Sequence, residues 1–145
     1  MKDERIKALA DFLEVEADEI TENDWENNAF DCNNETYLVL TDKEADEKAK
    51  EDILSSLWAF NADFIIRHCS TYDDMDQWEY DSAVKSLRKA QENECENLNP
   101  LVKALIEDIG DFVEDAIDAD GRGHFIARYD GEENEQDDYY IYRVD

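Results

Sequence analysis

The chain has 145 residues, a length that suits one globular domain with a sizeable core. It carries 41 acidic and 14 basic residues, a formal net charge of -27 at pH 7. So few bases argue against direct binding of nucleic acid or of an anionic membrane surface, both of which attract Lys and Arg. Because hydrophobic residues make up 42% of the sequence, the composition also argues against a disordered acidic tail. Cationic surfaces are the natural partners of so acidic a chain.

Cysteine content and the N-terminal sequence indicate the cellular compartment. Three widely spaced cysteines (Cys32, Cys69 and Cys95) provide neither a disulfide framework nor a CxxC metal pair. The N-terminal sequence MKDERIKALADF is charged and lacks the apolar core of a signal peptide. No apolar run approaches the length of a membrane span. These features predict a reduced, cytoplasmic protein.

The N-terminal part of the chain predicts a helix followed by an acidic segment. Apolar residues recur at helical spacing within 2–14; they are Ile6, Leu9, Ala10 and Leu13. The segment 15–28 is rich in acids and contains no base. We expect a short helical turn near 17–20 and expect Ile20 and Trp25 to pin the segment to the protein body.

A β-hairpin and a long helix come next. Residues 29–40 predict a hairpin that turns at Asn33-Asn34, because asparagine tolerates the left-handed backbone of tight turns. Its second strand is apolar enough to be buried on both faces. Thr41 and Glu44 have the spacing of a capping box, which begins a predicted helix over 42–69.

A break in that helix near Asn61 is the alternative to one continuous helix. A third helix is predicted over 74–94, and its inward-facing residues would be Trp78, Val84 and Leu87. The sequence Asn99-Pro100 then restarts the chain as an N-cap and a first helical residue. The helix that follows is predicted to run over 99–120 and to end at Gly121.

The 99–120 helix has two contrasting faces. Its apolar residues recur every three or four positions and predict a core face; they are Leu101, Leu105, Ile109, Phe112, Val113, Ala116 and Ile117. Its acidic residues form the other face; they are Glu107, Asp108, Asp111, Glu114, Asp115, Asp118 and Asp120. The helix is therefore predicted both to anchor the fold and to present a row of negative charge.

The C-terminal part predicts two strands, 124–129 and 139–144, joined by the acidic loop 130–138. With the first hairpin they would form one sheet. The predicted fold is a single α+β domain over 1–145, with about four helices packed on one face of a small three- to four-stranded antiparallel sheet.

Patterns of catalysis and metal binding are weak. The sequence from Asp118 to Gly121 resembles the start of a calcium loop, but the EF-hand spacing fails because the glycine comes too early. His68 and Cys69 are neighbours on a predicted helix and point about 100° apart, so they do not form a dyad. No Ser-His-Asp pattern or phosphate loop is present. We therefore expect no catalytic residues, no metal and no cofactor.

Acidic stretches without any base recur four times, at 11–35, 73–81, 107–120 and 130–138. An ordinary solvated surface mixes signs, as the chain does at 42–52. Carboxylates spaced along a helix face lie about 5–6 Å apart, a scale similar to that of phosphates along a DNA strand. This recurrence favours a surface that mimics nucleic acid.

Two stretches carry a resemblance to a protein group. GHFIARYDGEENE with the following YYIYR, and ETYLVLTDKEADEKAKEDILSSLWAFNADFI, together cover about half of the chain. Both resemble segments of small acidic bacteriophage and prophage proteins, a group without an established activity. The resemblance implies a setting in the cytoplasm of a bacterial host cell, where strongly acidic phage proteins are often counter-defence factors of the anti-restriction or anti-CRISPR type.

The sequence thus predicts a non-enzymatic inhibitor that binds the basic, nucleic-acid-binding surface of a host protein. The expected contact residues lie on the 99–120 helix and the C-terminal loop; they are Glu107, Asp111, Glu114, Asp115, Asp118, Glu132, Glu133 and Glu135. Two alternatives remain open. One is a structural or accessory phage protein whose acids maintain solubility, and the other is an enzyme with an unrecognised site.

Overall fold

A computed structural model describes residues 2–145, which form two compact units. Unit 1 contains the N-terminal residues up to Lys50 together with Asp120–Asp145, and unit 2 contains Glu51–Ala119. Both are strongly acidic, with 24 acidic and 9 basic residues in unit 1 and 17 acidic and 5 basic residues in unit 2. The single domain expected from the sequence stays a prediction.

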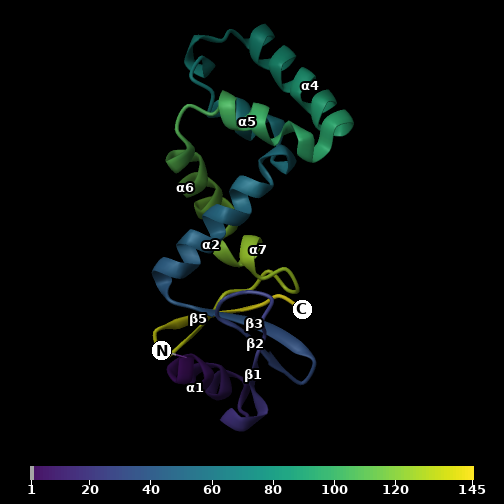
Figure 1. Cartoon of the computed structure of the whole chain (residues 1–145). Helices are drawn as coiled ribbons and strands as arrows, with labels where there is room; N and C mark the ends of the chain where they lie inside the picture. Colours follow the sequence, from purple (N-terminus) through teal and green to yellow (C-terminus); the bar gives the residue numbers. More distant parts are fainter. Residues whose placement is uncertain (1) are drawn as a thin grey trace. The chain divides into compact units, whose positions relative to one another are not determined.

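Unit 1 is built on a five-stranded antiparallel sheet with the order β1-β2-β3-β5-β4 (Figure 1). Its strands are β1 (Thr21–Glu22), β2 (Ala29–Cys32), β3 (Glu35–Leu40), β4 (Asn134–Gln136) and β5 (Tyr139–Arg143). The β2–β3 hairpin turns at Asn33 and Asn34, both with positive φ, as predicted. In the centre of the sheet Val39 lies opposite Ile141. The α+β class is thus confirmed, with more strands than expected.

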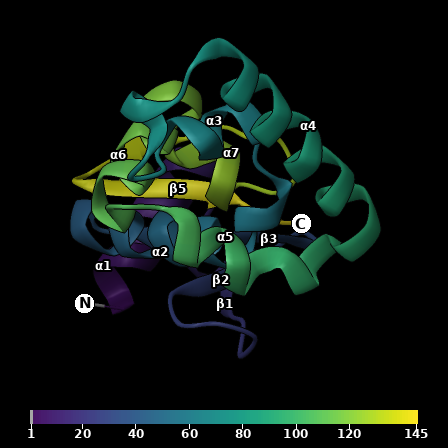
Figure 2. The same ribbon diagram turned by 90° about the horizontal axis from the view of Figure 1, so that it is seen from above.

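Both faces of this sheet are covered. Helix α1 (Lys2–Leu13) packs on one face, as the sequence predicted for 2–14, and the 3₁₀ turn Ala17–Glu19 follows it. The residues buried on that face are Ala8, Leu9, Ala10, Ile20, Phe30, Cys32, Tyr37, Val39, Tyr139 and Ile141. Alternate strand residues point to the opposite face. They too are buried, and α7 (Arg122–Ile126) lies on that side (Figures 1 and 2). The expectation of helices on one face only is wrong.

The predicted strand 124–129 is also wrong, because residues 124–126 belong to α7 and residues 127–129 follow it without forming a strand. Gly121, with φ of 83°, ends α6 as predicted and directs the chain into α7. The hairpin partner of β5 is β4, and the two-residue turn between them is Asp137–Asp138, both with positive φ. The β-propensity of HFIARY is overridden by tertiary packing around Gly123.

Gly123 provides a test of this packing. A Cβ atom built on Gly123 would lie 2.6 Å from the Gly131 carbonyl oxygen and 2.9 Å from the Glu133 nitrogen, both backbone atoms. We expect Gly123→Ala to lower the free energy of unfolding by about 1–3 kcal/mol through overpacking, measured by urea denaturation. Gly110→Ala is the control, since its nearest neighbour is the Asp108 side-chain oxygen at 3.2 Å, which needs to shift by only a few tenths of an ångström and can keep its hydrogen bond from the Asp111 N–H. Equal stability of Gly123→Ala and wild type would contradict the close approach.

Helix α2 (Asp42–Ser55) begins at the predicted capping box. The Glu44 N–H donates to Thr41 Oγ1 at 3.2 Å, and the Thr41 N–H donates to Glu44 Oε1 at 2.8 Å. The helix does not continue to residue 69 as expected. After Ser55 the chain makes a 3₁₀ turn over Leu57–Ala59, and α3 (Ala62–Arg67) follows, with Asn61 as its N-cap.

Side-chain amides satisfy the backbone groups that this interruption leaves unpaired. Asn99 Oδ1 accepts from the Trp58 N–H at 2.8 Å, and Asn99 Nδ2 donates to the Ser55 carbonyl at 2.7 Å. Gln91 Nε2 donates to the carbonyls of Trp58 and Phe60 at 2.8 and 2.6 Å. Asn99 is therefore not an N-cap as predicted. It lies within the first turn of the next helix.

The other helices of unit 2 are α4 (Gln77–Glu94), α5 (Asn99–Leu105) and α6 (Ile109–Asp120), and α3 packs against α4 and α5 (Figure 2). Val84 and Leu87 of α4 are buried as predicted, but Trp78 is 75% exposed, so its inward assignment is wrong. The predicted continuous helix 99–120 is wrong too, since α5 and α6 are separate helices.

The break between α5 and α6 lies where the chain contacts the end of α3. Ile106 adopts extended backbone and bridges to Cys69, and the Glu107 N–H donates to the His68 carbonyl at 2.9 Å. Asp108 then caps α6 by accepting from the Asp111 N–H at 3.1 Å. As a consequence, two residues predicted on the core face are exposed; they are Leu101 (51%) and Leu105 (37%).

Candidate interaction surface

Helix α6 has one buried and one acidic face. Phe112, Val113 and Ala116 are buried. Four exposed carboxylates lie at helical spacings of three and four on the other face; they are Asp111, Glu114, Asp115 and Asp118. We call these four residues the α6 acidic face. Because the apolar face of α6 is buried in the core, the α6 acidic face points toward solvent.

The α6 acidic face is dense in charge. From Asp111 to Asp118 the helix rises about 10.5 Å, at about 1.5 Å per residue. Four carboxylates occupy this length, about as many as the phosphates that one DNA strand places over the same distance at about 3.4 Å of axis each. Asp111, Glu114 and Asp118 form no ion pair with any of residues 2–145. Their charges are therefore available to a partner.

Asp115 has a partner within unit 2. His68 Nε2 lies 3.1 Å from Asp115 Oδ2. The His68 ring is held at the end of α3 by Phe64 and Phe112, whose ring centroids both lie 5.1 Å from its own. The pair fixes the position of Asp115, although 58% of that carboxylate side chain stays exposed. Sequence reasoning missed this pair, because 46 positions separate the two residues.

The remaining predicted residues lie at different places. Glu107 is exposed in the break before α6, in unit 2. Glu132, Glu133 and Glu135 belong to unit 1, where Glu132 precedes β4 and Glu135 lies exposed within it. The expected acidic loop over 130–138 is therefore interrupted by a strand, and its three glutamates do not share one tip.

Glu133 is engaged inside unit 1. Its Oε1 accepts hydrogen bonds from Arg122 Nε at 2.8 Å and from the Tyr142 hydroxyl. Arg122 Nη1 also reaches Asp42 Oδ1 at 2.8 Å and Asp46 Oδ1 at 3.0 Å. Burial and the hydrogen bond to Glu133 raise the pKa of the Tyr142 hydroxyl. Glu133 thus joins the C-terminal segment to α2 through Arg122, a role that the sequence did not indicate.

Comparison of the chain with protein-family models, curated proteins and solved structures found no match. Among residues 2–145, no three side chains of His, Cys, Asp or Glu are arranged to hold a metal ion. Within the same residues, no helix combines the length and the apolarity needed to cross a membrane.

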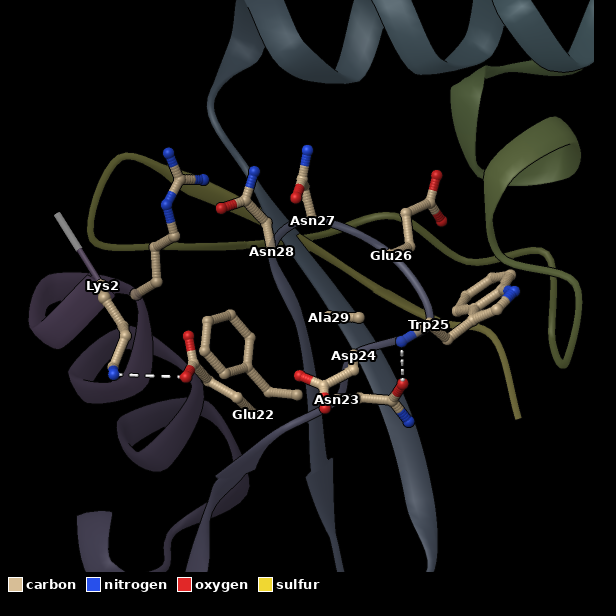
Figure 3. A pocket seen from close by; sticks show the side chains of 11 residues that line it. Lys2, Glu22, Asn23, Asp24, Trp25, Glu26, Asn27, Asn28 and Ala29 are labelled. Carbon is tan, nitrogen blue, oxygen red and sulfur yellow. Dashed lines mark hydrogen bonds and ion pairs between the residues drawn. The ribbon is translucent and has the colours of Figure 1, made fainter.

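A hollow of about 670 Å³ opens in unit 1 between the first turn of α1 and the segment from Glu22 to Phe30 (Figure 3). Lys2 and Arg5 line it from α1. The segment from Glu22 to Phe30 joins β1 to β2 and includes Trp25. Of the two residues expected to pin this region, Ile20 is buried, whereas Trp25 is 54% exposed.

Proposed function

We propose that the protein binds the basic, nucleic-acid-binding surface of another protein and competes there with nucleic acid. The α6 acidic face carries the proposal, since it presents four carboxylates on a helix whose opposite side is anchored in the core. Rows of carboxylates substitute for phosphates, and the net charge of -27 raises the rate of encounter with a cationic partner.

The proposed contact surface extends from the α6 acidic face to Glu107 in unit 2. The predicted contacts at Glu132, Glu133 and Glu135 belong to unit 1. Glu133 contributes least, because Arg122 and Tyr142 already bind its carboxylate. A bacterial host protein as target, and counter-defence as the purpose, remain part of the proposal on the basis of the phage-type resemblance.

The test is capture of partners from bacterial lysate at low and at high salt, followed by a competition assay. We expect a captured nucleic-acid-binding protein to lose its labelled DNA or RNA when this protein is added. Binding should weaken steeply with salt, because exposed charges are screened over about 8 Å at physiological ionic strength.

A matched pair of variants locates the surface. Replacing the α6 acidic face by the amides Asp111→Asn, Glu114→Gln, Asp115→Asn and Asp118→Asn should weaken capture at least about ten-fold, given the large electrostatic share of such binding. The control neutralises four other exposed acids of unit 2 through Asp73→Asn, Asp74→Asn, Glu92→Gln and Glu96→Gln. Equal losses in both variants would show that net charge, and not this face, governs binding. Recovery of no nucleic-acid-binding protein at low salt would contradict the proposed function.

A further inference from the structure

The hollow of unit 1 has a fixed shape on its loop side. The Asn23 N–H donates to the Ala29 carbonyl at 2.9 Å, which closes the segment between β1 and β2. Asn23 Oδ1 accepts from the Trp25 N–H at 2.7 Å, and Asn23 Nδ2 donates to the Asp31 carboxylate. These bonds hold Asp24 and Trp25 in place on the wall of the hollow (Figure 3).

The charges that line the hollow are paired, with one exception. The ion pairs are Lys2–Glu22 at 3.2 Å, Arg5–Glu44 at 2.7 Å and Glu26–Lys48 at 2.8 Å. Asp24 is exposed and forms no ion pair with any of residues 2–145. A carboxylate is thus the uncompensated charge of the lining, in a unit with 24 acidic and 9 basic residues.

Trp25 already binds one guanidinium group. The Arg128 Cζ atom lies 4.9 Å from the centroid of the indole ring, a cation–π distance. Arg128 does not line the hollow, whereas Trp25 does. The Trp25 side chain thus borders the hollow and also contacts a cation that lies outside its lining. The side-chain amides of Asn27 and Asn28 make no hydrogen bond with residues 2–145 and offer carbonyl oxygens as acceptors.

We propose that this end of the hollow binds the guanidinium group of an arginine side chain presented by another protein. Asp24 would supply the counter-charge, the Trp25 ring a flat π surface and Asn27 a neutral acceptor. Arginine fits better than lysine, because its planar fork stacks on aromatic rings and pairs with carboxylates. Lys2 lies at the opposite end from Trp25 (Figure 3), where its charge opposes the ligand least. The proposal that the arginine belongs to a basic partner protein rests on the proposed function, whereas the arginine site itself does not.

The test uses a defined probe and the full chain. A tripeptide with a central arginine and blocked ends is titrated into isotope-labelled protein and followed by nuclear magnetic resonance. The matched probe replaces arginine by citrulline, which has nearly the same shape and no charge. We expect saturable shifts of the backbone amides of residues 24–28 and of the Trp25 indole with the arginine probe. Equal shifts with the citrulline probe would overturn the proposal.

Variants assign the contacts. Asp24→Asn and Trp25→Ala should each weaken binding of the arginine probe by about two- to five-fold, the size expected for an exposed cation–π contact or charge contact. Trp78→Ala is the control, since this tryptophan is also exposed but belongs to unit 2. Binding that survives both hollow variants unchanged, or that is lost in Trp78→Ala, would overturn the site.

The outcome can be separated from that of the proposed function. The variant with the neutralised α6 acidic face should bind the arginine probe as wild type does, because Asp24 and Trp25 lie in unit 1. Loss of lysate capture in that variant with probe binding intact supports both proposals. If capture and competition succeed while the arginine probe gives no shifts, the hollow proposal fails and the proposed function stands.

Discussion

Replacing Phe112 by alanine is expected to lower the free energy of unfolding by about 3–5 kcal/mol, the cost of removing a fully buried aromatic side chain. The Phe112 side chain is fully buried. Its ring centroid lies 5.0 Å from that of Phe60 and 4.9 Å from that of Phe64, both edge-on. Alanine would leave a cavity among these rings and would also remove the contact that holds His68.

Urea denaturation followed by circular dichroism measures this effect. Leu101→Ala is the matched control, because it truncates an apolar side chain on another helix of unit 2 that is already half exposed. The control should change stability by less than about 0.5 kcal/mol. Since Phe112 anchors the side of α6 opposite the acidic face, Phe112→Ala should also weaken partner capture without changing any charge. A loss of stability no larger than that of the control would contradict this packing.

Local signals predicted local structure well. The Thr41–Glu44 spacing marked the start of α2, the two asparagines marked the β2–β3 turn, and Gly121 marked the end of α6. Each of these features depends on residues a few positions apart. The start of α6 carries such a signal as well, because Asp108 lies three residues before Asp111, whose N–H it caps. Apolar residues at helical spacing on both sides of Asp108 nevertheless predicted one continuous helix.

Interactions across long sequence separations account for the failures. The interruption after α2 depends on Asn99, more than forty residues away, whose amide replaces helical hydrogen bonds at Ser55 and Trp58. Beside the segment predicted as a strand, Gly123 approaches the backbone of Gly131 and Glu133, eight to ten positions further along the chain. No local pattern encodes either contact. The same holds for the candidate sites, since periodicity identified the α6 acidic face but could not bring α1 and Trp25 to one hollow.

Replacing Arg5 by methionine is expected to lower the free energy of unfolding by about 3 kcal/mol at pH 7. This value is the lower end of the cost of breaking a buried ion pair, because the partner carboxylate of Glu44 stays partly exposed. Arg5 is a buried charged residue of α1. Its Nη1 donates to Glu44 Oε1 and to the Val39 carbonyl, both at 2.7 Å. Methionine keeps much of the apolar stem and removes the charge. Lys7→Met is the control, because the Lys7–Asp11 pair is solvent-exposed and its loss should leave stability unchanged.

The pH dependence identifies the ion pair as the cause. Burial alone would raise the pKa of Glu44, but hydrogen bonds from Arg5 and the Thr41 N–H outweigh it and hold that pKa below its usual value. The contribution of the Arg5–Glu44 pair to the free energy of unfolding is therefore fully present above the pKa of Glu44 in the unfolded chain, about 4.3. It is lost as the pH falls through the lower folded pKa. Subtracting the stability of Arg5→Met from that of wild type cancels the titration of the other acids. We expect this difference to shrink from pH 7 to about pH 3, and a difference that stays constant would assign the effect of Arg5 to packing and the Val39 hydrogen bond alone.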